Sequence, residues 1–210
     1  MSAVRRLPFV GATRRLLATT AAPGPSQDGC SSNKSENLVC PQINSHVQAA
    51  INEQINVEYG AAYTYLSISF HFAKSNVGLL GFSKLYRAMS VEEVGHANKL
   101  ASYLLERNGS IDLRTIQKPS SCSWSNIGTT MNETVRMENT VSEALSQLYR
   151  IAEKHNDLVT TDFIVSEFFK EQIDEIRTLY LLIAKWRTLE KAPDGAFQLN
   201  RELLKKHESD

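Results

Sequence analysis

The sequence predicts an all-α protein, a four-helix bundle with one long crossover and a short fifth helix at its C-terminus. Four long segments carry apolar residues at steps of three, four and seven, which is the period of a helix with one buried face. The segment between the second and third of them lacks this period and is long enough to run back along a helix, so it can join parallel neighbours. No segment shows the pattern of a strand.

The expected helices begin and end at recognisable signals. The long helices are predicted at residues 45–74, 77–107, 126–155 and 158–189, and the short one follows residue 195. Ser45-x-x-Gln48 fits a capping box at the first helix start. Asn108-Gly109 fits a left-handed stop after the second helix. In the fourth helix, Phe169 is expected to point inward.

The first 27 residues differ in composition from the rest of the chain. They contain four arginines, many Ser, Thr and Ala residues and no acid. This composition predicts a mitochondrial transit peptide over residues 1–27, and therefore the mitochondrial matrix as the compartment. A secretory signal, or a disordered tail on a cytoplasmic protein, is the alternative. Residues 28–44 have the composition of a flexible segment, which leaves residues 45–210 as the folded domain.

Charge and cysteine usage exclude several classes of protein. The chain has 23 basic and 23 acidic residues, but without the four N-terminal arginines 19 basic residues face 23 acidic ones. That body has no basic stripe for nucleic-acid phosphates. The sequence has no uninterrupted apolar run of about 18 residues, so no membrane span is expected. Cys30, Cys40 and Cys122 form no CxxC pair, so free thiols are expected in place of a disulfide framework.

Each long helix carries a metal-capable residue where its apolar face should continue. These residues are Glu58 on the first helix, Glu93 and His96 on the second, Glu138 on the third and Gln172 on the fourth. A lone buried carboxylate is costly unless it is paired or coordinates a metal. Any one of them alone is more simply a surface residue. Four helices that each present one to the same core predict a cation site.

The spacing of these residues suits iron. Glu93-x-x-His96 places a carboxylate and an imidazole one turn apart on one face. A di-iron bundle takes a Glu from two helices and Glu-x-x-His from two others. The fourth helix offers Gln172-x-x-Glu175 and lacks the second histidine, so Glu175 is a candidate ligand or a surface residue. Tyr65 lies two turns after Glu58, either as a core tyrosine or with its hydroxyl near the site.

These segments resemble the ferritin family, specifically its heavy, ferroxidase-type animal subunit, and with the N-terminal segment they resemble a mitochondrial ferritin. The resemblance covers residues 44–193. Its most specific stretches are INEQINVEYGAAYTYLSISF, SVEEVGHANKL, MENTVSEALSQLYRIAEKHND and DFIVSEFFKEQIDEI. The fold that it implies is the ferritin-like four-helix bundle.

The resemblance also implies a ligand set. One iron is expected at Glu58, Glu93 and His96. The second is expected at Glu93, which bridges, and Glu138, with a water held by Gln172. Tyr65 is expected beside them.

The activity implied by the resemblance is oxidation of Fe(II) by dioxygen, followed by storage as ferric oxide mineral in a shell. The shell is expected to be a homo-oligomer of 24 subunits, with a mixed shell containing a second ferritin subunit left open. Two other classes remain as alternatives. One is a non-catalytic shell subunit, which the intact ligands disfavour. The other is a di-iron oxygenase, which normally needs the second Glu-x-x-His.

Two features depart from the family pattern. Of the carboxylates expected to nucleate mineral, Glu92 is kept, but the other two positions are Gly95 and Asn98. Of the two acids expected in the three-fold iron-uptake channel, Asp162 is kept and Val165 replaces the other. Nucleation and uptake are therefore expected to differ in detail from the family pattern.

Overall fold

The computed structural model confirms the all-α, ferritin-like bundle. It describes residues 42–119, 124 and 126–206, so the expected segment 1–27 and most of 28–44 lie outside the described residues. The helices are α1 (Ser45–Ala73), α2 (Leu80–Glu106), α3 (Ile127–Lys154), α4 (Leu158–Ile164), α5 (Lys170–Leu189) and α6 (Gly195–Lys206). The described part of the chain contains no strand. Nor does it contain a helix long and apolar enough to cross a bilayer.

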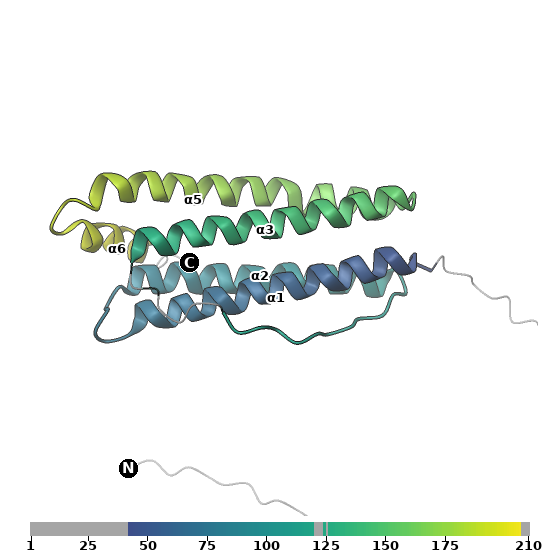
Figure 1. Ribbon diagram of the computed structural model, residues 1–210, viewed down its shortest axis with the longest axis horizontal. Coiled ribbons are helices and arrows are strands. Elements are labelled where there is room, and N and C mark those ends of the chain that lie inside the picture. Colours follow the sequence, from purple (N-terminus) through teal and green to yellow (C-terminus); the bar gives the residue numbers. More distant parts are fainter. Residues whose placement is uncertain (1–41, 120–123, 125, 207–210) are drawn as a thin grey trace, which may run out of the picture. The chain divides into compact units, whose positions relative to one another are not determined.

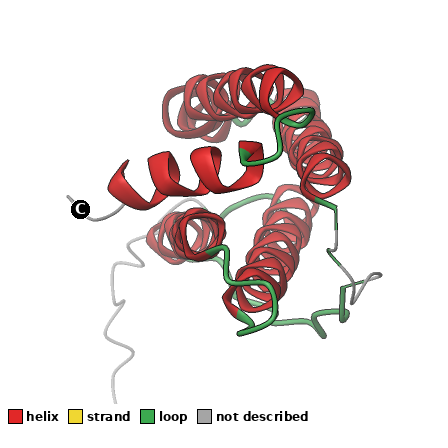
Figure 2. Cartoon of the chain, turned by 90° about the vertical axis from the view of Figure 1, so that its left-hand side faces the viewer, coloured by secondary structure: helices red, strands yellow, loops and turns green. Residues whose placement is uncertain are grey.

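The long helices form two antiparallel pairs. α1 packs along α2, and α3 packs along α5 (Figure 1). The contact of α1 with α3 joins the two pairs, while α6 lies across one end against α2 and α5 (Figure 2). α2 and α5 also face each other, but their described backbones do not come into close contact. This separation leaves room for side chains and a pocket between them.

The long crossover runs along α1, as expected for a connection between parallel helices. Figure 1 shows its described part, up to residue 119, passing beneath α1 from the end of α2. The amide of Asn52 fixes it there, because Nδ2 donates to the carbonyl of Ser110 (2.9 Å) and Oδ1 accepts from the backbone N–H of Asp112 (2.8 Å). These bonds hold α2 and α3 in the same direction, which brings their buried polar residues to one level.

The start of α1 differs from the expected capping box. Asn44, not Ser45, is the N-cap, and its side chain accepts a hydrogen bond from the N–H of His46 (2.9 Å). Gln48 instead accepts from the backbone N–H of Ser110 (2.9 Å). The prediction was wrong because Asn is as good a cap as Ser and the crossover competes for Gln48. At the end of α2, Asn108 adopts φ 54°, which confirms the left-handed stop.

The expected fourth helix is one rod that contains a π-helical turn. Residues Val165–Phe169 form this turn between α4 and α5, and the flanking residues keep right-handed helical dihedrals. A π turn accommodates an extra residue and shifts the faces that follow. Phe168 is the fully buried residue, at 2% exposure, while Phe169, which was expected to point inward, is partly buried and packs against the core. Phe168 packs edge-on against His96, with ring centroids 5.7 Å apart.

Candidate metal centre

Five polar residues lie in the middle of the bundle, where apolar side chains would otherwise continue the core. Each is no more than 6% exposed. They come from four long helices: Glu58 from α1, Glu93 and His96 from α2, Glu138 from α3 and Gln172 from α5. The structure thus brings together all five residues that the sequence places in the core as candidate ligands.

Three of these residues form one compact group. Glu58, Glu93 and His96 each offer a ligand atom, and these atoms lie within 4.8 Å of one another. His96 Nδ1 is 3.0 Å from Glu93 Oε2, as expected for residues one turn apart on α2. Glu58 Oε2 is buried and receives no hydrogen bond from an amide, hydroxyl or backbone donor, while the Glu93 carboxyl group is the acid paired with Glu58. A buried carboxylate oxygen without a donor is suited to a cation.

Glu138 forms the second half of the centre. The Tyr65 hydroxyl donates a hydrogen bond to Oε1 of Glu138, and Gln172 Nε2 donates to its Oε2 (2.7 Å). Gln172 Nε2 also lies 3.3 Å from the Glu138 carbonyl. Both carboxylate oxygens are therefore oriented by neutral donors from two other helices. Tyr65 is fully buried, and its bond to Glu138 brings its hydroxyl into the group of candidate ligands.

Burial and mutual repulsion disfavour simultaneous ionisation of the carboxylates of the centre. Burial is the main cause that raises the pKa of Glu93 to about 9, and the charge of Glu138 is the second. Burial, and then the charge of Glu93, raises the pKa of Glu58 well above its usual range. A divalent cation would reverse both effects, because it favours the charged carboxylates. Oxygen donors with one imidazole suit iron(II) among the common divalent metals.

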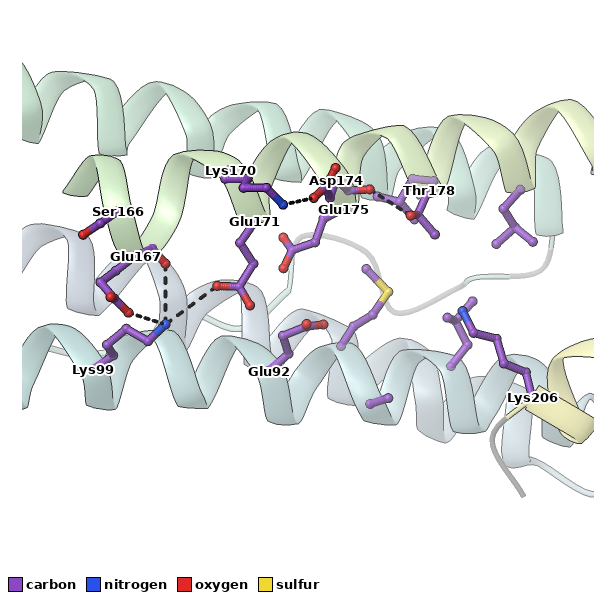
Figure 3. Close-up of a pocket in the computed structure, with 15 residues that line it drawn as sticks. Glu92, Lys99, Ser166, Glu167, Lys170, Glu171, Asp174, Glu175, Thr178 and Lys206 are labelled. Carbon is purple, nitrogen blue, oxygen red and sulfur yellow. Dashed lines mark hydrogen bonds and ion pairs between the residues drawn. The ribbon is translucent and has the colours of Figure 1, made fainter. Parts of the chain in front are cut away.

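A pocket of about 580 Å³ opens between α2 and the π turn and α5, beside the centre (Figure 3). Glu92, Glu171 and Glu175 project into it from the two sides. His96 does not line this pocket but lies beside it, because its Nε2 is 3.5 Å from Oε2 of the pocket residue Glu171. His96, Glu171 and Glu175 offer a second group of ligand atoms within 4.8 Å of one another. The imidazole of His96 therefore faces both groups.

Glu175 lies in this pocket and not among the five central residues. Its Oε1 is buried without a hydrogen-bond partner. Burial, and then the charge of Glu138, raises the pKa of Glu175 to about 8. Glu171 is half exposed and is paired with Lys99 at 3.7 Å. The alternative was that Glu175 is a surface residue paired with a lysine. Among the described residues, the lysines of this region pair with Glu167, Glu171 and Asp174, and none pairs with Glu175.

The remaining candidates are not among the five central residues. Asp162 is exposed on α4, and Val165, at 48% exposure, follows it in the π turn. Glu92 is exposed on α2, while Asn98 accepts a hydrogen bond from the Tyr59 hydroxyl (3.1 Å). The roles expected for Asp162 and Glu92 depend on an assembled shell, so they stay predictions.

Sequence reasoning missed two residues that touch the site. Gln54, one turn before Glu58, donates from Nε2 to Glu58 Oε1 (2.7 Å). A polar residue between Ile51 and Ile55 on the buried face was the signal that could have found it. Glu171 contacts His96 but lies in an acidic stretch that reads as a solvated surface, so no local pattern distinguishes it.

Comparisons with known proteins agree with this geometry. A family model for the ferritin-like domain matches residues 48–189. The chain is 35% identical over 171 residues to a chloroplastic ferritin (ferritin-4) of Arabidopsis thaliana, and 37% identical over 161 residues to a chloroplastic ferritin of Malus baccata var. xiaojinensis. These matches cover 80% and 75% of this chain, and 66% and 64% of the plant proteins.

A third relative comes from an animal. The soma ferritin of Lymnaea stagnalis is 37% identical over 132 residues, which is 63% of this chain and 76% of that protein. These relatives show the family but not the subtype. The expected heavy-chain and mitochondrial subtypes stay predictions.

Proposed function

The chain belongs to the ferritin family, and from this premise we propose that it is an iron-storage subunit with its own ferroxidase centre. The observation that carries the proposal is the buried group Glu58, Glu93 and His96 beside the doubly oriented Glu138. A subunit that only builds the shell would gain stability by filling these positions with apolar residues. Iron(II) is the substrate and ferric oxide mineral is the stored product.

In this proposal two Fe(II) ions bind side by side. Glu58, Glu93 and His96 hold the first ion. Glu93 and Glu138 hold the second, and Gln172 orients a water on it. Glu93 can serve both ions because carboxylates bind hard cations in flexible modes and bridge them. Each ion gives up one electron, and the pair reduces one dioxygen to the peroxide level. Three carboxylates in a dry core favour the higher charge of Fe(III).

Tyr65 and Gln172 position Glu138 for this reaction. Both donate to its carboxylate, which fixes the side chain before metal arrives. Burial, and then the charge of Glu138, raises the pKa of Tyr65 well above its usual value, so the hydroxyl stays a neutral donor at physiological pH. A carboxylate held in this way loses little freedom when it binds the second ion.

We further propose that Glu175 acts after oxidation. It lies with Glu171 on the open side of His96 and faces the pocket with one unpartnered oxygen. The raised pKa of Glu175 means that its carboxyl group is mainly protonated at pH 7 without metal, and incoming iron displaces that proton. The resulting carboxylate would draw iron from the second position toward the pocket. Glu175→Ala should then slow the second half of oxidation and product release and leave the first iron's affinity unchanged. If the Glu175→Ala variant oxidises and releases iron with the same time course as the native protein, this role is contradicted.

The assembly and the compartment are proposals of the same kind. A homo-oligomeric shell of 24 subunits gives Asp162 its role as the acidic ring of the iron-uptake channel, and Glu92 its role as the retained nucleation site. A mixed shell with a second ferritin subunit type remains the alternative assembly. Two relatives are chloroplastic ferritins, which supports an organellar transit peptide. The acid-free, arginine-rich residues 1–27 favour the mitochondrion over the cytoplasm or secretion.

One assay separates a ferroxidase from the two alternatives, a non-catalytic shell subunit and a di-iron oxygenase. The double variant Glu93→Lys with His96→Gly removes the shared ligand and the imidazole together. If the chain is a ferroxidase, this variant assembles but loses rapid aerobic formation of Fe(III). Equal initial rates in the variant and the native protein would identify a non-catalytic shell subunit. Iron-dependent oxidation of an added organic compound would identify an oxygenase.

A further inference from the structure

The buried amide of Gln54 has no structural role that its contacts explain. Gln54 lies on α1 between Ile51 and Ile55 and is only 1% exposed. Its Nε2 makes one hydrogen bond, to Glu58 Oε1 at 2.7 Å, and its Oε1 is buried without a partner. A buried amide that is half satisfied destabilises a core relative to an apolar residue of similar size. Its single bond therefore points to a role at Glu58.

Asn52 shows what a structural amide looks like on the same helix. Its Nδ2 donates to the carbonyls of Gln48 (3.2 Å) and Ser110 (2.9 Å), and its Oδ1 accepts from the backbone of Asp112. Each polar atom of Asn52 is therefore used to hold the crossover. Gln54 has no such contact, and its one described partner is a carboxylate of the candidate centre.

The bond to Gln54 makes the two oxygens of Glu58 different. Oε1 is held by the amide, while Oε2 receives no hydrogen bond from an amide, hydroxyl or backbone donor. The same arrangement recurs at Glu138, where Gln172 Nε2 also donates at 2.7 Å. Glu58 and Glu138 are thus each held by one glutamine amide. Glu93 is the proposed bridging ligand between them.

We propose that Gln54 is a positioning residue that presents Glu58 to the first metal through Oε2. The inference rests on the proposed ferroxidase function and adds a residue that nothing else assigns to it. The amide fixes the Glu58 side chain in one orientation, so the carboxylate binds through one oxygen. A hydrogen bond to the charged form also favours the ionised ligand. The first site should therefore depend on Gln54, and the second should not.

Anaerobic titration with Zn(II), which is redox-inert, tests this on the assembled full-length protein. Gln54→Met conserves volume and removes the donor. Loss of a hydrogen bond to a charged group corresponds to about tenfold in affinity. We expect Gln54→Met to weaken the first zinc about tenfold and to leave the second within about twofold. Gln54→Glu keeps the shape but replaces the donor by a second acid, so it should weaken the first site further.

Gln48→Met is the matched control. It makes the same chemical change on α1, but its side chain contacts the backbone of Ser110 and not the centre. It should bind both zinc ions as the native protein does. If Gln54→Met does not assemble, Gln54→Glu alone decides, because weakening confined to the first zinc supports the proposal and two native affinities overturn it.

Glu58→Gln separates failure of this inference from failure of the proposed function. Native zinc binding by Gln54→Met, together with loss of the first zinc in Glu58→Gln, overturns the role of Gln54 and leaves the centre intact. Native binding by Glu58→Gln as well would overturn the centre itself. Equal weakening of both zinc ions in Gln54→Met would show a general packing defect and would also overturn the positioning role.

Discussion

The metal-free protein should become more stable when Glu93 is replaced by Gln. Burial and the neighbouring Glu138 raise the pKa of Glu93 to about 9, from a reference value of 4.5. At pH 7 the folded protein therefore holds a proton that the unfolded chain has released. The 2.5 pH units between 4.5 and 7 correspond to about 3 kcal/mol of destabilisation. Glutamine keeps the shape and never ionises, so this cost disappears in the variant.

The sign of the effect follows from the direction of the pKa shift. A carboxyl group whose pKa is raised in the folded state hardly changes the free energy of unfolding below pH 4.5. As the pH rises from 4.5 toward 9, it lowers the free energy of unfolding by an increasing amount. The difference between Glu93→Gln and the native protein should therefore be small at pH 4.5 and reach about 3 kcal/mol at pH 7. For a domain of this size that is a rise in melting temperature of about 6–12 °C.

Thermal unfolding in chelator at several pH values measures this difference. Zn(II) should reverse it, because the cation stabilises the native site and the variant has lost the bridging ligand. A metal-free Glu93→Gln protein that melts below the native protein at pH 7 would refute the electrostatic account of the centre. So would a difference that does not change between pH 4.5 and 7.

Three further predictions follow from the other parts of the site and the chain. Tyr65→Phe removes a donor to Glu138, so it should weaken the second zinc about tenfold in anaerobic titration and spare the first; native binding would show that Tyr65 is only a core residue. Asp162→Ala should slow iron uptake at low ionic strength, because it removes the acid that we propose lines the uptake channel; unchanged uptake means that iron passes elsewhere. A fluorescent fusion of residues 1–27 should reach mitochondria and lose this targeting when Arg14 and Arg15 become Glu, whereas a diffuse or secreted signal from the unmutated fusion contradicts the transit peptide.

The fold was predictable because its information is periodic and local. Apolar spacing marks the long helices, and a crossover without period fixes their directions. The candidate ligands were predictable for a related reason, since each interrupts an apolar face at one level of the bundle. Glu93 and His96 are the clearest case, because one turn of helix is enough to bring them together.

Features that depend on contacts between elements were not predictable. The π turn at Val165–Phe169 leaves no signal, because Phe168 and Phe169 both fit a buried face and packing against His96 selects the first. The cap at Asn44 depends on the crossover, which binds Gln48. The bond of Gln54 to Glu58 is local, but its importance appears only when the other polar atoms of Gln54 are found without partners.

Anomalous diffraction from crystals soaked in Fe(II) without oxygen tests the central claim most directly, because it locates iron independently of any activity. The account predicts two iron peaks in each subunit, one bound by Glu58, Glu93 and His96 and the other by Glu93 and Glu138. Metal–ligand distances should be about 2.0–2.6 Å. Soaked crystals of Glu93→Lys with His96→Gly should lose both peaks. Iron found only on the surface, with the five central residues free of metal, would contradict a ferroxidase centre in this chain.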